Sequence, residues 1–200
     1  MANVLPLSYY QNDDVVFLAK DLIGKKICTN INGQFTSAVI TETEAYCGRN
    51  DKACHANNGK RTKRTEIMFQ EGGKAYVYLC YGIHNLFNIT TNIDGLADAI
   101  LVRAVQPLDG KEIMLQRRNK TVFDKSLTSG PGILSKALGI DRSLYAASLV
   151  GPSIWLEESP EKISSSQIVE TTRIGVDYAG EDALRPWRFY LKNSEWVSKK

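Results

Sequence analysis

The chain has 200 residues, 43% of them hydrophobic and 24% charged, which is an ordinary composition for a globular protein. This length favours one domain over residues 1–200 and suffices for a buried core. The first 14 residues are mostly polar or turn-forming, which argues against a secretory signal, and no apolar run has the length of a membrane span. The formal net charge of +3 permits nucleic-acid binding without requiring it.

The amino-terminal part of the sequence predicts a helix followed by a β-hairpin. Asp13 or Asp14 is placed to cap the helix, whose apolar residues recur at helical spacing until Gly24 ends it. Residues 26–31 and 34–46 have strand patterns separated by Asn-Gly, a pair that readily adopts the positive φ angles of a type I′ turn. The second strand is therefore predicted to be paired and rigid.

The end of that second strand reads Glu42-Thr43-Glu44-Ala45-Tyr46 and looks like part of a reaction site. Side chains alternate along a strand, so Glu42, Glu44 and Tyr46 share one side. The two carboxylates are expected to lie about 6 to 7 Å apart, a separation found in the acid and base pairs of sugar hydrolases. An exposed pair of strand carboxylates without catalytic function is the alternative interpretation.

A long loop follows from residue 47 to residue 73, with a helical turn expected at residues 66–69. Loops of this length in a compact domain often carry function. A dense basic run in the loop contains Lys60, Arg61, Lys63 and Arg64. A solvated loop would explain such a run, but its position beside a site for a flat ligand favours contacts with phosphates. A second basic run covers residues 117–120.

The remaining elements complete the predicted fold. Strand patterns occupy residues 74–81, 86–91 and 99–105, helical patterns residues 109–118 and 132–138, and strand patterns again residues 153–156 and 188–191. Pro131 stands where the second of these helices begins, and Gly139 ends it. Strands joined by short turns favour antiparallel pairing. The predicted fold class is α+β, a single domain built on a largely antiparallel, curved β-sheet with packed helices.

Four cysteines raise the questions of disulfides and of metal. A chain of this length does not need a disulfide framework, so reduced thiols in a cytosolic compartment are the preferred interpretation. A zinc site can be assembled on paper from Cys47, Cys54, His55, Cys80 and His84. The C-x-x-C pairs of structural zinc sites are absent from the sequence, so we expect neither a metal nor another cofactor.

A series of short motifs runs in order through nearly the whole chain. The motifs are Leu18-Ala19-Lys20-Asp21-Leu22-Ile23-Gly24, Glu42-Thr43-Glu44-Ala45-Tyr46, His55, Met68-Phe69, Tyr76-Val77-Tyr78, Tyr81-Gly82, Asn88-Ile89, Leu101-Val102-Arg103-Ala104, Leu127-Thr128-Ser129-Gly130-Pro131-Gly132, Arg173-Ile174-Gly175-Val176, Ala179-Gly180-Glu181 and Trp187-Arg188-Phe189-Tyr190. Each motif alone is weak evidence, whereas the ordered series is specific. The chain resembles the alkyladenine DNA glycosylases, also called 3-methyladenine DNA glycosylases, which start base excision repair.

This resemblance implies an enzyme that flips an alkylated or deaminated purine out of duplex DNA and hydrolyses its N-glycosidic bond. The implied substrates are purines of the 3-methyladenine, hypoxanthine and ethenoadenine class, and the product is an abasic site. By the resemblance, Glu44 is the general base that activates water and stabilises the positively charged sugar, and Arg103 helps to orient that water. A structural ion pair is the alternative for Arg103.

The resemblance also implies the contacts with the base and the duplex. Tyr46, His55 and Tyr78 hold the flipped base, and Asn88 obstructs the exocyclic amino group of guanine. Tyr81, beside Gly82, enters the minor groove, provided that a turn projects its ring from the sheet edge. For the tyrosines, packing in the core is the alternative. For His55 the alternatives are capping of the loop or facing a phosphate.

The basic loop departs from the family pattern. Where the family usually has arginine, threonine, proline, arginine and asparagine, this chain has Arg61-Thr62-Lys63-Arg64-Thr65. Lysine in place of proline is expected to free the loop, and threonine in place of asparagine removes a side chain that both donates and accepts hydrogen bonds. The departure therefore predicts a change in loop order or in the placement of DNA.

Three alternative activities remain open at this point. The first is a non-catalytic module that stacks bases on its tyrosines, and the second is an enzyme that acts on free nucleosides or formyl groups. The third is additional strand cleavage by a lysine, for which Lys74 is the nearest candidate in the sequence. The preferred partner is double-stranded DNA with a damaged purine, bound by a monomer. The expected location is cytoplasmic, with the nucleoid, in a bacterium, or nuclear in a eukaryote.

Overall fold

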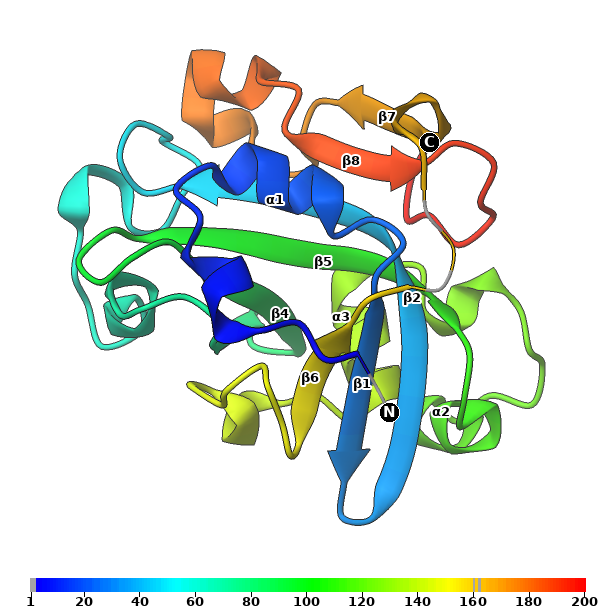
Figure 1. The fold of residues 1–200 in the computed structure, drawn as a ribbon. Helices are drawn as coiled ribbons and strands as arrows, with labels where there is room; N and C mark the ends of the chain where they lie inside the picture. Colours follow the sequence, from blue (N-terminus) through cyan, green and yellow to red (C-terminus); the bar gives the residue numbers. More distant parts are fainter. Residues whose placement is uncertain (1–2, 160, 162) are drawn as a thin grey trace.

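The computed structural model describes residues 3–159, 161 and 163–200 and is dominated by one eight-stranded sheet (Figure 1). The strands are β1 (Lys26–Ile31), β2 (Gln34–Cys47), β3 (Ala75–Cys80), β4 (His84–Thr91), β5 (Asp98–Pro107), β6 (Ile154–Glu157), β7 (Ile168–Thr171) and β8 (Arg188–Leu191). The main path of the sheet is β3-β4-β5-β2-β1-β6, while β8 pairs with β2 and with β7. All these pairings are antiparallel. The predicted α+β fold with a largely antiparallel sheet is confirmed.

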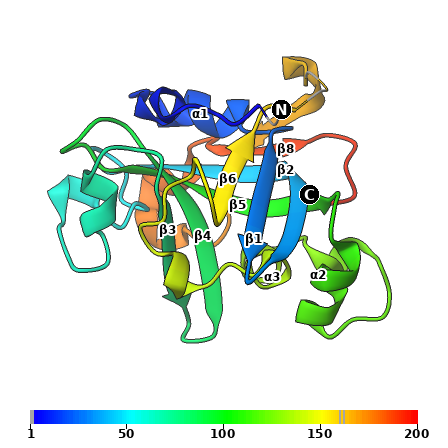
Figure 2. The same ribbon diagram turned by 60° about the horizontal axis from the view of Figure 1, so that its bottom comes forward.

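Helices cover both faces of this sheet. The α-helices are α1 (Val15–Asp21), α2 (Lys111–Arg118) and α3 (Pro131–Leu138), and the 3₁₀-helices are η1 (Leu7–Gln11), η2 (Asn57–Gly59), η3 (Glu66–Phe69), η4 (Lys125–Leu127), η5 (Arg142–Leu144), η6 (Ser165–Gln167) and η7 (Asp177–Leu184). In Figure 1, α1 lies in front of the sheet and α3 behind it, and Figure 2 shows α1 and the β3–β4 hairpin at opposite ends of the molecule. None of the helices in the described ranges is long and apolar enough to cross a membrane.

Local signals in the sequence account for several element boundaries. Asp14 caps α1, because its Oδ1 accepts hydrogen bonds from the backbone N–H groups of Val16 and Phe17. Asn32 and Gly33 have φ angles of 53° and 77°, as a type I′ turn requires, and they join β1 to β2 in the predicted hairpin. The predicted start of the helix and the turn of the hairpin are therefore confirmed, whereas α1 ends at Asp21, before the predicted stop at Gly24.

Strand β2 changes partners along its length. One of its edges pairs with β5, and the other pairs first with β1 and then with β8. The register with β5 is irregular between Ile40 and Thr43, and β2 bends strongly along its course (Figure 1). Beyond this irregularity, Glu44 lies opposite Leu101 of β5 on one side and Arg188 of β8 on the other. The residue is thus fixed in the interior of the sheet.

Two features of the fold differ from the sequence prediction. Strand β7 was not predicted, since its four residues are not clearly apolar and pair only with β8 at the sheet edge. The long loop after β2 contains the predicted turn η3, but it also packs a hydrophobic cluster of its own, formed by Cys54, Ala56, Ile67, Met68, Phe69, Tyr76, Ala97 and Ala99. This cluster anchors the loop beside β3 and β5.

Candidate active site

A cavity of about 550 Å³ opens on the side of the sheet that carries α3. It is lined by side chains of β2, β3, β4 and β5, by loop residues between positions 53 and 68, by residues 130–133 at the start of α3 and by residues 174–176 and 178. Five of the residues predicted for the chemical site and base pocket line this cavity, and they are Tyr46, His55, Tyr78, Asn88 and Arg103. The structure therefore brings these five side chains together.

Glu44 lies directly behind the cavity wall and has no exposed surface. Its Oε2 accepts hydrogen bonds from the Tyr46 hydroxyl at 2.7 Å and from Nη1 of Arg103 at 3.1 Å. Its Oε1 accepts a 2.7 Å hydrogen bond from the backbone N–H of Ile174. All three donor residues line the cavity, whereas Glu44 itself does not. Three donors from three different segments thus fix the orientation of the carboxylate.

Glu42 is equally buried but points into a separate set of partners. It accepts hydrogen bonds from Nη1 of Arg188 at 2.7 Å and from the backbone N–H of Ser198 at 2.6 Å. It also accepts one from Nε of Arg103 at 3.2 Å. The interpretation of Glu42 as a structural, backbone-bonded carboxylate is confirmed. The alternative of an exposed carboxylate pair is wrong, because neither Glu42 nor Glu44 reaches the surface.

Arg103 forms the structural ion pair that was the alternative for it, and it also faces the cavity. It lines the cavity, and it forms ion pairs with both Glu42 and Glu44. Burial lowers the pKa of its guanidinium, but the charges of Glu44 and Glu42 raise that pKa by more, so the net shift is upward. Arg103 is therefore a permanently charged group that joins the two carboxylates at the cavity wall.

Aromatic rings form two sides of the cavity. His55 and Tyr78 meet edge to face with ring centroids 4.8 Å apart, and Nδ1 of His55 is hydrogen-bonded to the Tyr76 hydroxyl at 2.9 Å. Burial, and then the charges of Arg64 and Lys60, lower the pKa of His55 to about 4. The imidazole is therefore neutral at physiological pH. His55 lies in the cavity wall, as its predicted place in the base pocket requires, and its ring is hydrogen-bonded to Tyr76 rather than to the loop backbone.

Tyr46 is held from behind by a buried ion pair. The guanidinium of Arg173 lies over its ring at 4.9 Å from the centroid. Arg173 in turn contacts both carboxylate oxygens of Asp51, at 2.5 and 2.8 Å, and both side chains are fully buried. One face of the Tyr46 ring is thus occupied by the protein, and the ring is half-buried rather than packed in the core.

Asn88 lies at the cavity, and Tyr81 lies in an exposed turn. Asn88 on β4 is 4% exposed and donates through Nδ2 to the backbone oxygen of Tyr76 at 3.1 Å. Tyr81 begins the turn between β3 and β4 with φ 51°, and its side chain is 92% exposed. The turn needed to project this ring is present, and the alternative of a core aromatic at Tyr81 is wrong.

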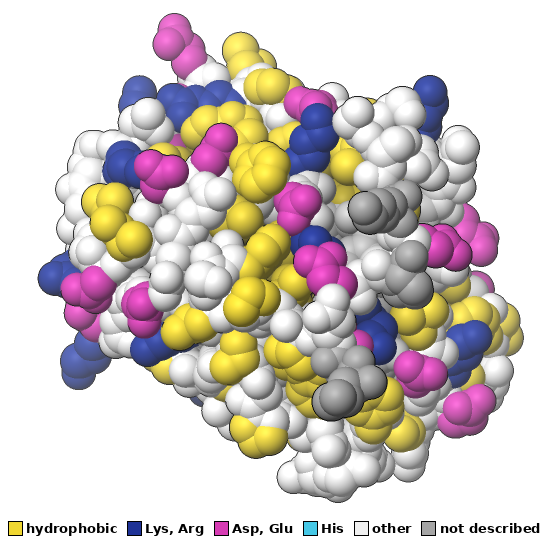
Figure 3. All heavy atoms as spheres, viewed as in Figure 1, with side chains coloured by type: hydrophobic (Ala, Val, Ile, Leu, Met, Phe, Trp, Pro, Cys, Tyr) yellow, Lys and Arg dark blue, Asp and Glu magenta, His cyan; other side chains and the backbone are white. Residues whose placement is uncertain are grey.

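The four predicted DNA-backbone residues are all exposed but differ in their contacts. Lys60 and Arg64 line a hollow of about 270 Å³ next to the cavity, and Arg64 also lies over the Tyr78 ring. Arg61 packs over Phe69 and pairs with Glu66 at 3.5 Å, and Lys63 is exposed on the same loop. On the face that carries α1, by contrast, acidic and basic side chains are interspersed (Figure 3).

Hydrogen bonds between two threonines hold the altered loop, and the expected change in loop order or DNA placement stays a prediction. Oγ1 of Thr65 donates to the backbone oxygen of Lys60 and accepts from the backbone N–H of Thr62, both at 2.9 Å. Oγ1 of Thr62 accepts in return from the N–H of Thr65 at 3.2 Å. These reciprocal bonds close the loop without proline or asparagine.

The second basic run belongs to the scaffold. Arg117 donates to the backbone oxygen of Ala137 and to the side chain of Gln34, which ties α2 to α3 and to the β1–β2 hairpin.

The four cysteines are free, and burial raises the pKa of Cys54 to about 12. Within the described ranges, no three His, Cys, Asp or Glu side chains are grouped as metal ligands.

Sequence reasoning missed three contributors to this site. They are the N–H of Ile174, the Asp51–Arg173 pair and the Tyr76 hydroxyl. The motif Arg173-Ile174-Gly175-Val176 was recognised as part of the series, but no spacing in the sequence indicates that Ile174 reaches Glu44, 130 positions away.

Comparisons with known proteins identify the family. Residues 8–195 match the family model of methylpurine-DNA glycosylase. The chain is 47% identical over 189 residues to a protein of Chlamydia felis, covering 94% of this chain and 96% of that protein. It is 46% identical over 198 residues to one of Methanocella arvoryzae, covering 98% and 96%. Both relatives carry the provisional name 3-methyladenine DNA glycosylase. The chain therefore belongs to the methylpurine-DNA glycosylase family.

Proposed function

We propose that the protein is a monofunctional DNA glycosylase that flips alkylated or deaminated purines out of duplex DNA and releases them by hydrolysis. As a member of this family it is a hydrolase of N-glycosyl bonds in DNA, which argues against a non-catalytic module and against an enzyme for free nucleosides. The finer proposal concerns its substrates, which we take to be the 3-methyladenine, hypoxanthine and ethenoadenine class, and its steps.

The observation that carries the proposal is the carboxylate of Glu44, held by Tyr46, Arg103 and Ile174 at the cavity wall. In the reaction, the bond between the base nitrogen and C1′ breaks and its electron pair leaves with the base. A water oxygen bonds to C1′, and Glu44 accepts the proton of that water. The three donor residues separate the carboxylate from the cavity, and we propose that the attacking water reaches it between Tyr46 and Arg103. The negative charge of Glu44 also stabilises the oxocarbenium-like sugar.

The aromatic walls support binding of a flipped base. A purine between Tyr46 on one side and His55 with Tyr78 on the other regains the stacking that it loses on leaving the duplex. The neutral imidazole of His55 adds no positive charge against a cationic alkylpurine. Asn88 at the side of the cavity limits the room for the exocyclic amino group of guanine.

The surroundings of the cavity support the proposed binding of a duplex. We propose that the ring of Tyr81, which is exposed, fills the gap that the flipped nucleotide leaves. Lys60, Arg61, Lys63 and Arg64 supply positive charge for the phosphates. We propose that a monomer suffices for one lesion, and that the enzyme acts where the chromosome lies, in the cytoplasm of a bacterium or the nucleus of a eukaryote.

Strand cleavage by a lysine is not part of the proposal. Lys74 donates to Gln70 at 2.7 Å, and its side chain does not line the cavity. A Schiff base with C1′ requires an amine within reach of that carbon. The expected product is therefore an abasic site in an intact strand.

The test is a base-release panel with duplexes that carry 3-methyladenine, hypoxanthine or ethenoadenine. The wild type is expected to release free base and leave the strand uncleaved, whereas Glu44→Gln is expected to bind the same duplexes and release base at least about a hundredfold more slowly. Absence of base release by the wild type from all three lesions would refute the proposal. A full rate in Glu44→Gln would assign the base role to another residue.

A further inference from the structure

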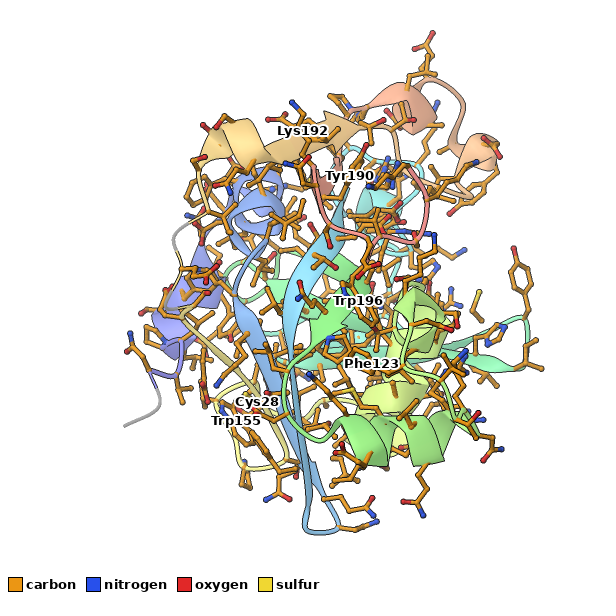
Figure 4. All side chains as sticks on the ribbon, turned by 90° about the vertical axis from the view of Figure 1, so that its right-hand side faces the viewer. Cys28, Phe123, Trp155, Tyr190, Lys192 and Trp196 are labelled. Carbon is orange, nitrogen blue, oxygen red and sulfur yellow. The ribbon has the colours of Figure 1, made fainter. Side chains whose placement is uncertain are left out.

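Residues 196–199, here called the strap, follow β8 after a short connection and contact the buried carboxylate of Glu42. Trp196 is 6% exposed and belongs to the main hydrophobic core. Its ring centroid lies 5.3 Å from that of Phe123, in the loop after α2, and Figure 4 shows the two rings side by side. Its backbone oxygen accepts a hydrogen bond from Oγ1 of Thr41. The strap is therefore anchored on both sides.

Ser198 within the strap supplies two of the hydrogen bonds that satisfy Glu42. Its backbone N–H donates to Oε2 at 2.6 Å and its hydroxyl to Oε1 at 2.9 Å. Arg188, which also donates to the backbone oxygen of Lys199 at 2.8 Å, and Arg103 supply the others. A buried carboxylate requires such donors, since an unpaired charge in the interior is strongly destabilising.

Arg103 transmits this arrangement to the reaction site. Its guanidinium donates through Nε to Glu42 and through Nη1 to Glu44. Because the guanidinium is planar and rigid, fixing Nε also fixes Nη1. We propose that Glu42 and Ser198 are positioning residues for hydrolysis, which hold Arg103 against Glu44 and thereby set the path of the attacking water. This inference rests on the proposed function.

Two kinds of substitution displace Arg103 in opposite directions. Without the donors of Ser198, the Glu42 carboxylate attracts Arg103 more strongly. The guanidinium then moves away from Glu44, and the ion pair between Arg103 and Glu44 weakens. Glu42→Gln removes the competing negative charge, and Arg103 turns toward Glu44. The other charged group beside Glu44 is Arg173, behind Tyr46, and neither substitution touches it.

The experiment measures single-turnover release of a cationic lesion, 3-methyladenine, as a function of pH, together with the Kd for the same duplex. Ser198→Ala removes the hydroxyl, and Ser198→Pro removes both donors. We expect the rate to fall several-fold in the first and about tenfold to a hundredfold in the second, with Kd within about twofold of wild type. In the plot of rate against pH, the acid limb is expected to move to higher pH in Ser198→Pro and to lower pH in Glu42→Gln.

Ser143→Ala is the matched control, because that serine hydroxyl also donates to a carboxylate, Asp141, outside the cavity lining. A wild-type rate and an unshifted profile in Ser198→Ala overturn the inference, even where Ser198→Pro fails to fold. If the rate falls but the acid limb shifts in neither variant, the strap only maintains the structure. This outcome also overturns the inference. An inactive wild type refutes the proposed function instead, so the two failures are distinguishable.

Discussion

The hydroxyl of Tyr46 donates a 2.7 Å hydrogen bond to Oε2 of Glu44, two positions earlier on the same face of β2. One side chain therefore offers its ring to the cavity and its hydroxyl to the proposed base. Tyr46→Phe keeps the ring and removes the donor. We expect base release to slow by about tenfold to a hundredfold, because a hydrogen bond to a charged group contributes about 1.5 to 3 kcal/mol, while affinity for a lesion duplex stays near wild type.

The control for this substitution is Tyr9→Phe, since the Tyr9 hydroxyl donates to the carboxylate of Asp21 at the same distance of 2.7 Å, and neither residue lines the cavity. Single-turnover rates and duplex affinities are measured for both variants. Equal rates for Tyr46→Phe and wild type contradict a role of the hydroxyl in orienting Glu44.

The depressed pKa of His55 predicts how stability depends on pH. Its pKa is about 4 in the folded protein, lowered from 6.5 by burial and by the charges of Arg64 and Lys60. Between these two values the unfolded chain binds a proton that the folded protein does not bind, so stability is lost as pH falls from about 6.5 to about 4. Urea unfolding across this window should show a shallower loss in His55→Gln than in the wild type.

Nuclear magnetic resonance of the imidazole protons checks the same prediction directly. The chain has two histidines, so in the His84→Gln variant the imidazole signals come from His55 only. We expect no titration of these signals between pH 8 and pH 6. A midpoint near 6.5 shows that His55 is solvated and that the aromatic wall is open.

The Asp51–Arg173 pair is predicted to dominate the stability of the site. Both side chains are fully buried, and removing one partner leaves an unpaired buried charge. Asp51→Asn is expected to lower the free energy of unfolding by about 3 to 5 kcal/mol. The control is Glu170→Gln, which breaks a surface pair with Lys20 and should change stability by less than about 1 kcal/mol. Similar losses in the two variants exclude a special role for the buried pair.

Substitution of Tyr81 should change the unstacking of DNA but not the stability of the fold. Its side chain is 92% exposed, so Tyr81→Ala is expected to change the free energy of unfolding by less than about 0.5 kcal/mol. Fluorescence of a 2-aminopurine placed beside the lesion reports unstacking and should rise less with this variant than with the wild type. Val122→Ala, at another exposed apolar residue, 61% exposed, provides the comparison. An undiminished signal in Tyr81→Ala assigns the wedge to a different side chain.

The cationic rim of the cavity should appear in the salt dependence of binding. Each lost phosphate contact reduces the slope of log K against log salt by about 0.9. We expect the double variant Lys60→Ala, Arg64→Ala to lower the slope by about 1 to 2 and to weaken binding equally for damaged and undamaged duplexes. Lys20→Ala, on α1 away from the cavity, should leave the slope unchanged. A loss restricted to damaged DNA contradicts phosphate contacts.

The parts of the fold that could be predicted from sequence are those with local causes. Asp14, the Asn32-Gly33 pair and Gly139 act on their own neighbours, and the helices and hairpin that they bound are present. The pairing of β2 with β8 joins segments about 146 positions apart, as for Glu42 and Arg188, and the irregular register of β2 arises in its pairing with β5. No periodicity within either segment contains that information.

The residues of the candidate site likewise fall into those that the sequence predicts and those that it does not. Motifs predicted Glu44, Tyr46, His55, Tyr78 and Arg103, but not the Ile174 N–H, the Asp51–Arg173 pair and the Tyr76 hydroxyl that hold them. Backbone groups such as the N–H of Ile174 have no side-chain signature in a sequence. The mutual hydrogen bonds of Thr62 and Thr65 were not predicted either, because their geometry depends on how the loop folds back on itself.

The change of partners along β2 has a consequence for hydrogen exchange and inactivation. The amides around Glu44 are flanked by β5 and β8, and the N–H of Ala45 is bonded to the backbone oxygen of Trp187. Such amides exchange with solvent only through opening of the whole molecule. Partial unfolding of the peripheral helices or of β7 therefore leaves the proposed base in place, and heat inactivation should follow the global melting curve with no earlier phase.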